Sequence, residues 1–326
     1  MFQKKLAVVL GASSGQSASV ANRLLDTGLY RVRGVARSIT SKETQCLVQK
    51  GMELCQANFD DPPSLANAFA GANVLFAVTK MYDGDVNREI SQGKHIANAA
   101  ASVDAIEHFI WSTLPSAWVV TSRRISVPYM DGKAEVDEHI ITMLPALAQK
   151  TTFVWGGFYA ENVLYPNYAP NLLATAARHV WIQPVDPNTL IPMVGDHIAN
   201  IGIIVERVIQ QPKACLPMKY VMAVTEWMAN GAILEMWAHI AGEAKGEQID
   251  AVYVKSDLET VAALWPQNGR EMGELLQVLE TMGQMAWTKK GISPVTLNDL
   301  GLKVGKGAGD LTSVEAAFKK FSSSLR

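Results

Sequence analysis

Residues 6–20 constrain the fold of this chain more than any other segment. They read LAVVLGASSGQSASV, an apolar run that stops at Gly11 and continues with helix-like spacing. A buried strand, a glycine turn and a helix start in this order are typical of a nucleotide-binding unit, because free N–H groups at a helix N-terminus favour phosphate. The alternative is a plain strand-to-helix turn without a ligand. The residues expected at the phosphates are Gly11, Ser13, Ser14, Gly15 and Gln16.

Two serines depart from the glycine fingerprint of such a turn. Read as G-x-x-G-x-x-G, the three positions are Gly11, Ser14 and Ser17, and the other register, G-x-x-x-G-x-G, contains Gly15 but again ends at Ser17. A side chain at Ser17 fills space where the helix packs against the strand, and one at Ser14 crowds the phosphate, although a hydroxyl can itself donate to phosphate. We therefore expect a nucleotide to bind, tightly or weakly depending on how both serines are accommodated.

The composition excludes several classes of protein. The 326 residues are 48% apolar and 18% charged, enough for one large domain with an added lobe or for two domains. Because 29 basic residues face 31 acidic ones, no basic surface for nucleic acid is expected. The three cysteines and six histidines have no metal-ligand spacing, so we expect no metal site and reduced thiols. No run is long enough for a membrane span, and a cytoplasmic location is expected.

The first half of the chain alternates between strand-like and helix-like segments. Strands are predicted near residues 6–10, 30–37, 51–57, 73–78, 108–112 and 151–155, with helices at 19–26, 63–70, 85–102 and 133–143. Such repeated βαβ units with short connections predict a doubly wound parallel sheet of the Rossmann type, with helices on both faces. We assign residues 1–156 to this dinucleotide-binding domain.

The pattern loosens in the second half, which is interrupted by prolines. Helices are predicted at 196–211, 225–242 and 267–288. We expect residues 157–326 to form mainly a smaller α+β lobe that closes over the strand ends and binds substrate. A part of it, at about 190–215, is expected to return to the main sheet.

Polar residues follow the predicted strands at the edge where ligands bind in such sheets. Arg37 and Lys42 come after the second strand, where a cation suits a 2′-phosphate and favours NADP(H) over NAD(H); the alternative is a solvated arginine. Thr79, Lys80 and Met81 follow the fourth strand and are expected beside the phosphates, the nicotinamide ribose or the substrate, although Thr79 and Lys80 could equally be simple polar residues at a strand exit.

Two further groups suggest catalysis. Ser112 and Thr113, followed by Leu114, end the fifth strand, where a hydroxyl can polarise a carbonyl, although strand capping explains them nearly as well. Tyr129 and Lys133 are four residues apart and can share one helical face, where an ammonium stabilises a phenolate and the phenol protonates an oxyanion. Against this, Gly132 weakens the helix, and Lys133 is also correctly spaced for an exposed pair with Asp137.

Four motifs in order resemble the NmrA-like branch of the atypical short-chain dehydrogenases/reductases. They are residues 11–20 (GASSGQSASV), 111–115 (WSTLP), 131–136 (DGKAEV) and 156–162 (GGFYAEN), within a similarity over residues 5–240. The resemblance implies a dinucleotide-binding fold, usually with NADP(H), found in reductases, often of fungal secondary metabolism, and in cofactor-sensing regulators without turnover. It implies a place near the nicotinamide for Lys133, and a loop flanking cofactor and substrate that contains Phe158, Tyr159 and Asn162.

The predicted function is an NADP(H)-dependent reduction of a carbonyl, enone or imine in a small apolar metabolite. Tyr129 is the expected proton donor, Lys133 its partner and a ribose ligand, and Ser112 or Thr113 the group that orients the carbonyl. The cofactor set is Gly11, Ser13, Ser14, Gly15, Gln16, Arg37, Lys42, Thr79, Lys80, Lys133, Gly156 and Phe158; the substrate set is Met81, Leu114, Tyr159 and Asn162. The alternatives are a redox-sensing regulator that docks onto a transcription factor and a non-redox cyclase or isomerase.

Overall fold

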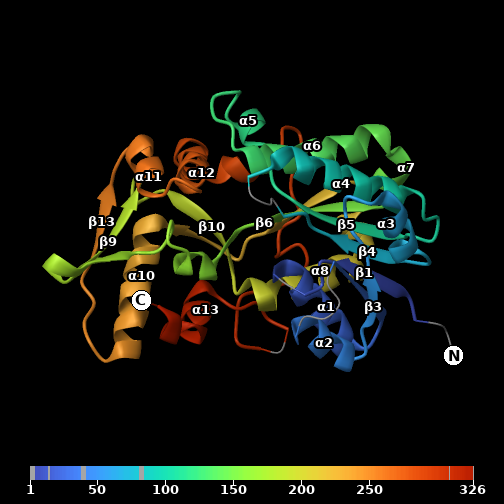
Figure 1. The fold of residues 1–326 in the computed structure, drawn as a ribbon, viewed down its shortest axis with the longest axis horizontal. Helices are drawn as coiled ribbons and strands as arrows, with labels where there is room; N and C mark the ends of the chain where they lie inside the picture. The colour runs from blue at the N-terminus through green and yellow to red at the C-terminus, as the bar shows by residue number, and fades with distance from the viewer. Residues whose placement is uncertain (1–3, 14, 38–41, 81–83, 308, 326) are drawn as a thin grey trace.

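A seven-stranded parallel sheet forms the larger part of the molecule (Figure 1). The computed structural model describes residues 4–13, 15–37, 42–80, 84–307 and 309–325. The strands lie in the order β11-β6-β5-β4-β1-β2-β3, and each neighbouring pair is parallel. Their bounds are β1 Leu6–Leu10, β2 Arg31–Ala36, β3 Glu53–Gln56, β4 Val74–Ala77, β5 His108–Thr113, β6 Thr151–Gly156 and β11 Lys219–Ala223. The predicted doubly wound sheet is confirmed.

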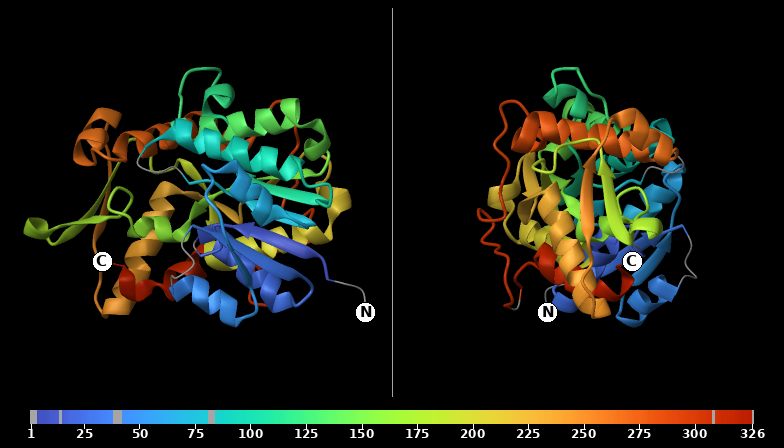
Figure 2. Two further views of the ribbon diagram at one scale, coloured as in Figure 1. Left: turned by 45° about the vertical axis from the view of Figure 1, so that its right-hand side comes forward. Right: turned by 90° about the vertical axis from the view of Figure 1, so that its left-hand side faces the viewer.

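Helices cover both faces of this sheet (Figures 1 and 2). Helices α1 and α8 pack together on one face, where Gly202 donates its N–H to Ser19 Oγ at 2.7 Å. Helices α3, α4 and α6 lie on the other face. The bounds are α1 Gly15–Thr27, α2 Lys42–Gln49, α3 Pro62–Phe69, α4 Val86–Ala101, α5 Ala117–Val120, α6 Pro128–Met143, α7 Pro145–Ala148, α8 His197–Gln210 and α9 Pro212–Cys215. The apolar strands between these layers are buried, which fixes the position of every strand end.

The return of the chain to the main sheet differs from the prediction in one respect. Helix α8 does cover the sheet, as expected for the segment 190–215. Strand β10 (Leu190–Gly195) instead joins a separate sheet with β7 and β12. The seventh strand of the main sheet is β11, which the sequence analysis did not predict. A strand of five residues that follows two prolines and precedes another short strand, β12, has too little periodicity to be recognised.

The remaining elements form the predicted smaller α+β lobe. Two mixed sheets have the orders β12-β10-β7 and β13-β9-β8. The bounds are β7 Phe158–Tyr159, β8 Asn171–Leu173, β9 Arg178–Gln183, β12 Glu226–Ala229, β13 Ala251–Lys255, α10 Asn230–Lys245, α11 Leu258–Leu264, α12 Gly269–Met282 and α13 Val314–Lys320. Two predicted helices are thus too long: residues 226–229 form β12, and α12 ends where Gly283 takes a positive φ of 53°.

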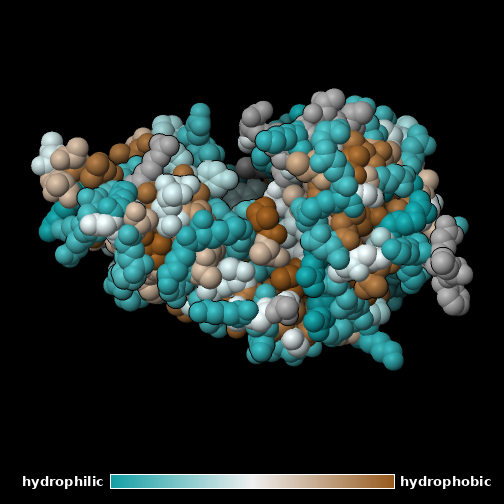
Figure 3. All heavy atoms as spheres, turned by 90° about the horizontal axis from the view of Figure 1, so that it is seen from below, coloured by the Kyte–Doolittle hydropathy of each residue, from teal (hydrophilic) through white to brown (hydrophobic). Residues whose placement is uncertain are grey.

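Seen from below, the surface is mostly hydrophilic and is hollowed where the larger and the smaller part meet (Figure 3). Within the described residues, no helix combines the length and the apolar character needed to cross a membrane.

Two buried titratable side chains lie on β5 and α6. His108 Nε2 donates to Thr152 Oγ1 at 2.8 Å, because the Thr152 hydroxyl gives its own proton to the carbonyl of Cys215. Burial lowers the pKa of His108 to about 4. Asp137 accepts from the indole N–H of Trp111 at 3.0 Å, and burial raises its pKa to about 8. The structure therefore favours the neutral form of both groups.

Asp137 is expected to make the protein less stable as the pH rises. Between its ordinary pKa near 4 and its folded value near 8, the unfolded chain binds fewer protons, so stability falls by at most about 1.4 kcal/mol per pH unit. Asp137→Asn retains an acceptor for Trp111 and removes this titration. Urea unfolding of both proteins at pH 5.5 and pH 7.5 should show that the free energy of unfolding of the variant, relative to that of the wild type, is greater at pH 7.5 than at pH 5.5. A constant difference between the two proteins would contradict the buried, protonated Asp137.

Candidate active site

A cleft of about 790 Å³ lies over the carboxyl ends of β1, β2 and β4, and is hereafter called the nucleotide cleft after its predicted ligand. Its floor is the turn from β1 into α1, where Gly11 and Gly15 have positive φ values of 67° and 54°. These values are strained for any residue with a Cβ atom. Gly15 is also the first residue of α1, so the helix N-terminus faces the cleft. Of the predicted phosphate residues, Gly11, Ser13, Gly15 and Gln16 line this cleft, and Ser14 lies outside the described residues.

Ser17 does not block the turn. Its side chain is 1% exposed and packs beneath Gly11, where a Cβ atom on the glycine would still lie 3.6 Å from Ser17 Oγ. Apart from its chain neighbours, a Cβ on Gly15 would meet no atom of the described residues within 4 Å, so these residues leave the space in front of α1 open. A positive φ at two glycines, an open helix N-terminus and this volume fit the diphosphate of a dinucleotide.

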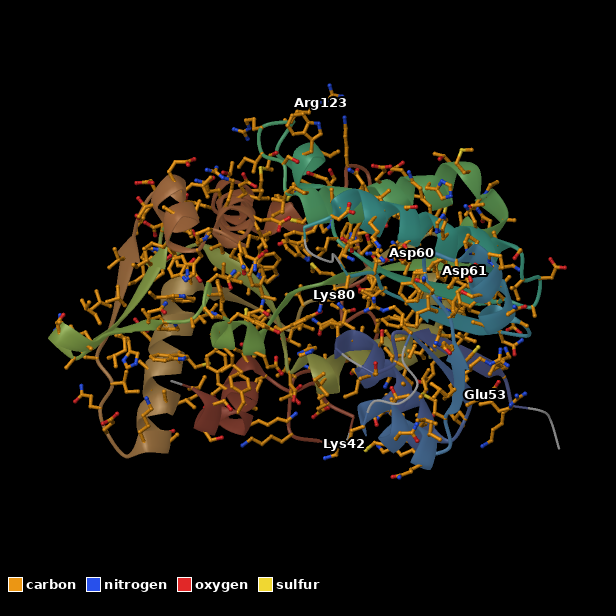
Figure 4. All side chains as sticks on the ribbon, in the orientation of Figure 1. Lys42, Glu53, Asp60, Asp61, Lys80 and Arg123 are labelled. Atoms are coloured by element: carbon orange, nitrogen blue, oxygen red, sulfur yellow. The ribbon has the colours of Figure 1, made fainter. Side chains whose placement is uncertain are left out.

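The predicted cations differ in their positions (Figure 4). Arg37 lines the cleft just beyond β2, and Lys80 lines it beyond β4, near the middle of the molecule. Lys42 begins α2 at the lower edge in this view and is absent from the described lining of the cleft. The lining of the cleft also contains a pair that the sequence analysis missed, His197 Nδ1 and Glu161 Oε2, which are 3.1 Å apart.

A second cavity of about 310 Å³, hereafter the inner cavity, adjoins the nucleotide cleft. The two share Gln16, Val78, Thr79, Lys80 and Tyr159. Its lining includes the predicted catalytic residues Ser112, Thr113, Tyr129 and Lys133 and the predicted substrate residues Leu114, Tyr159 and Asn162. Gly156 and Phe158, which were predicted to bind the cofactor, also line it. Its apolar wall of Met272, Leu275 and Trp287 comes from α12 and the turn after it and was not predicted. Met81 lies outside the described residues.

Gln16 connects the turn at α1 to the inner cavity. The Ser112 hydroxyl donates to Gln16 Oε1 at 2.7 Å, and Gln16 Nε2 donates to the Tyr159 hydroxyl at 2.7 Å. The Tyr159 ring in turn stacks on His197, with ring centres 4.1 Å apart. Ser112 therefore has to turn its hydroxyl away from Gln16 before it can donate to a substrate carbonyl.

Lys133 is bound to groups other than Tyr129. Its ammonium donates to Glu89 Oε1 at 2.7 Å, to the Thr79 carbonyl at 2.9 Å and to the Thr79 hydroxyl at 3.1 Å. The Thr79 hydroxyl donates to the same Glu89 oxygen at 2.8 Å. The side chains of Lys133 and Glu89 are 12% and 2% exposed, so this is a buried ion pair. The sequence analysis did not predict it.

Close packing of α4 against α6 brings this pair together. A Cβ atom on Gly132 of α6 would lie 2.7 Å from Val86 Cγ2 of α4, and one on Gly93 of α4 would lie 2.7 Å from Val136 Cγ2 of α6. Two glycines facing opposite ways thus let the helices approach closely, and Glu89, between Val86 and Gly93, reaches Lys133. Gly132 is needed for this contact, although it was expected only to weaken its helix.

Gly132→Ala is expected to lower the free energy of unfolding by about 1–3 kcal/mol, because its methyl group overpacks the α4–α6 contact. Urea unfolding of the variant and the wild type measures the change. In a Val86→Ala background, which removes the nearest atom, Val86 Cγ2, the same replacement of Gly132 should cost less. A Gly132→Ala protein as stable as the wild type would contradict the close packing.

Tyr129 keeps its proton in this environment. It lies in the first turn of α6, which begins at Pro128, and lines the inner cavity. Burial and, secondarily, the Glu271 carboxylate raise the pKa of its phenol. Since the Lys133 ammonium is bound to Glu89 and Thr79, the predicted support of a phenolate by Lys133 is not set up in this arrangement.

Comparison with known proteins identifies the family of this chain. Residues 3–300 match the NmrA-like family. The chain belongs to that family. It is 28% identical over 170 residues to an NmrA-like family domain-containing oxidoreductase of Aspergillus hancockii, a match that covers 51% of this chain and 50% of that protein. This NmrA-like chain thus spans about half the length of the curated oxidoreductases that it matches.

Solved structures of the same fold include both enzymes and regulators. Leucoanthocyanidin reductase of Vitis vinifera, solved with NADPH, has a TM-score of 0.71 at 14% identity, with 98% of this chain and 99% of that chain covered. NmrA, a negative transcriptional regulator solved with NADP, has a TM-score of 0.66 at 19% identity, with 100% and 93% covered. At these identities the likeness establishes the fold of this NmrA-like protein and nothing about its activity.

Proposed function

We propose that this NmrA-like protein is an NADP(H)-dependent reductase of a carbonyl, enone or imine in a small apolar molecule. The observation that carries the proposal is the junction of two cavities at one edge of the sheet. The outer one suits a dinucleotide, and the inner one, about 310 Å³ with an apolar wall, suits a small substrate. The Aspergillus relatives named oxidoreductases support it. A role in fungal secondary metabolism rests on family resemblance alone.

The bound cofactor would supply the hydride. The protein would bind and orient the cofactor and the substrate and would protonate the product. The N-terminus of α1 would hold the diphosphate, and Arg37 the 2′-phosphate. Met272, Leu275 and Trp287 would exclude water from the inner cavity. Tyr129, whose phenol keeps its proton at neutral pH, would donate it to the oxyanion of the product.

Purified protein mixed with NADPH and a panel of ketones, enones and imines tests this proposal. Turnover would appear as a loss of nicotinamide absorbance. Tyr129→Phe is expected to lower kcat by about 100-fold or more with little change in NADPH affinity, because only the proton donor is removed. Turnover that survives this change would overturn the assigned proton donor, and a wild-type protein that does not bind NADPH would overturn the proposed function.

A second candidate is a dinucleotide-sensing regulator without turnover. One observation favours it: the Lys133 ammonium is paired with Glu89, so it is not free to stabilise a phenolate at Tyr129. The NmrA structure with NADP belongs to a negative transcriptional regulator of the same fold. This candidate predicts that calorimetry detects NADP(H) binding while no compound in the panel consumes NADPH.

A further inference from the structure

One buried carboxylate oxygen of a residue that lines the inner cavity has an unused capacity to accept hydrogen bonds. Glu89, a residue of α4, is 2% exposed and lines this cavity. Its Oε1 receives both Lys133 and Thr79, whereas its Oε2 has no hydrogen-bond partner among the described residues. Leaving a charged oxygen unpaired in the interior costs free energy, so an unpaired oxygen on a residue that lines a cavity indicates that a ligand donor can pair with it when the cavity is filled.

Lys133, by contrast, has no donor to spare. A lysine ammonium carries three protons, and the structure shows three acceptors for them: the Thr79 carbonyl, the Thr79 hydroxyl and Glu89 Oε1. A direct bond from Lys133 to a ribose hydroxyl, as the sequence analysis expected, would require one of these to break. The group that is ready to bind a hydroxyl at this point is therefore an acceptor.

The position of Glu89 determines which hydroxyl group of a bound dinucleotide it can reach. Thr79, which bonds to both Glu89 and Lys133, lines the nucleotide cleft as well as the inner cavity. The three side chains thus lie at the junction, which a dinucleotide with its diphosphate at α1 would cross with its nicotinamide half. The ribose in that half offers two hydroxyl donors, and a carboxylate that accepts from a hydroxyl makes a short, strong hydrogen bond.

We propose that Glu89 Oε2 binds a hydroxyl group of the nicotinamide ribose, and that Lys133 is a positioning residue that holds the Glu89 carboxylate in place. The inference rests on the proposed function, since it requires a dinucleotide in the cleft. It reverses the polarity expected from sequence: the protein accepts from the ribose at this site instead of donating to it.

Calorimetric titrations of the Glu89→Gln protein with three probes test the inference. NADPH contains the whole dinucleotide, reduced nicotinamide mononucleotide only the nicotinamide half, and 2′,5′-ADP only the other half. Loss of a charged hydrogen bond is expected to weaken binding of the first two by about 10- to 100-fold and to leave 2′,5′-ADP unchanged. Glu135→Gln, which removes an exposed α6 carboxylate 2.6 Å from Lys94, is the matched control and should change none of the three.

The double variant Glu89→Gln/Lys133→Met removes both charges together, so no unpaired charge remains in the interior. It serves as the second test protein if Glu89→Gln alone does not fold. It should show the same difference between the probes. Equal NADPH affinity in Glu89→Gln and wild type would overturn the inference alone. An equal loss for 2′,5′-ADP would also overturn it, because the effect would then be a general distortion of the site. A wild-type protein that binds none of the probes would overturn the proposed function first.

Discussion

Replacing Lys133 by methionine is expected to lower the free energy of unfolding by about 3–5 kcal/mol, because it leaves the buried Glu89 carboxylate without its counter-charge. Methionine has nearly the same length and fills the same space, so the loss is electrostatic and not a cavity effect. The Thr79 carbonyl loses its Lys133 donor at the same time. Urea unfolding followed by circular dichroism measures the change.

A double-mutant cycle separates this pair from a general effect of losing a lysine. Glu89→Gln/Lys133→Met should recover a large part of the lost stability, because no unpaired charge remains in the interior. Lys94→Met is the matched control: its partner Glu135 is 53% exposed, and its loss should cost less than about 1 kcal/mol. If Lys133→Met and Lys94→Met had the same small effect, the buried pair would not exist as described.

Placing a glutamate at Gly15 is expected to weaken NADPH binding by about 100-fold or more. The new side chain would begin in open space at the start of α1, and its carboxylate would occupy the place proposed for the diphosphate. Charge repulsion and loss of hydrogen bonds to charged phosphate, each worth about 1.5–3 kcal/mol, account for this magnitude. Calorimetric titration of the variant with NADPH measures the loss.

Gly28→Glu provides a closely matched control at the other end of the same helix. Gly28 has a φ of 63°, against 54° at Gly15, and a Cβ at either position would meet no atom within 4 Å. Both variants therefore carry the same backbone strain and the same added charge, but only Gly15 lines the cleft. Similar NADPH affinities for the two variants would show that the nucleotide does not lie at the start of α1.

Much of the fold could be predicted from the sequence, because local patterns determine it. The strands β1, β4, β5 and β6 are fully buried, and successive strands from β1 to β6 are separated by helices, which is sufficient to predict a parallel sheet. Elements determined by long-range pairing were not found: β11 adds to the sheet beside β6 only in three dimensions, and β12 reads as the beginning of α10. Sequence periodicity carries no information about which distant strand a short segment will join.

The site was predictable where it depends on strand ends and not where two helices meet. Ser112 lies at the end of β5, Thr79 and Gly11 lie just beyond β4 and β1, and all three were found for that reason. The Glu89–Lys133 pair depends on the glycine contacts between α4 and α6, which no local pattern shows. One signal was present: Glu89 falls on the same face of α4 as the buried Ile96 and Ala100, and a charge within an apolar stripe indicates a buried partner.

A crystal structure of the protein grown with NADPH tests the central claim most directly. The account predicts the diphosphate at the N-terminus of α1 beside Gly11 and Gly15, the 2′-phosphate near Arg37 and the nicotinamide half at the mouth of the inner cavity. Crystals grown with excess NADPH that show the cleft filled by protein side chains, or the nucleotide bound elsewhere, would contradict it.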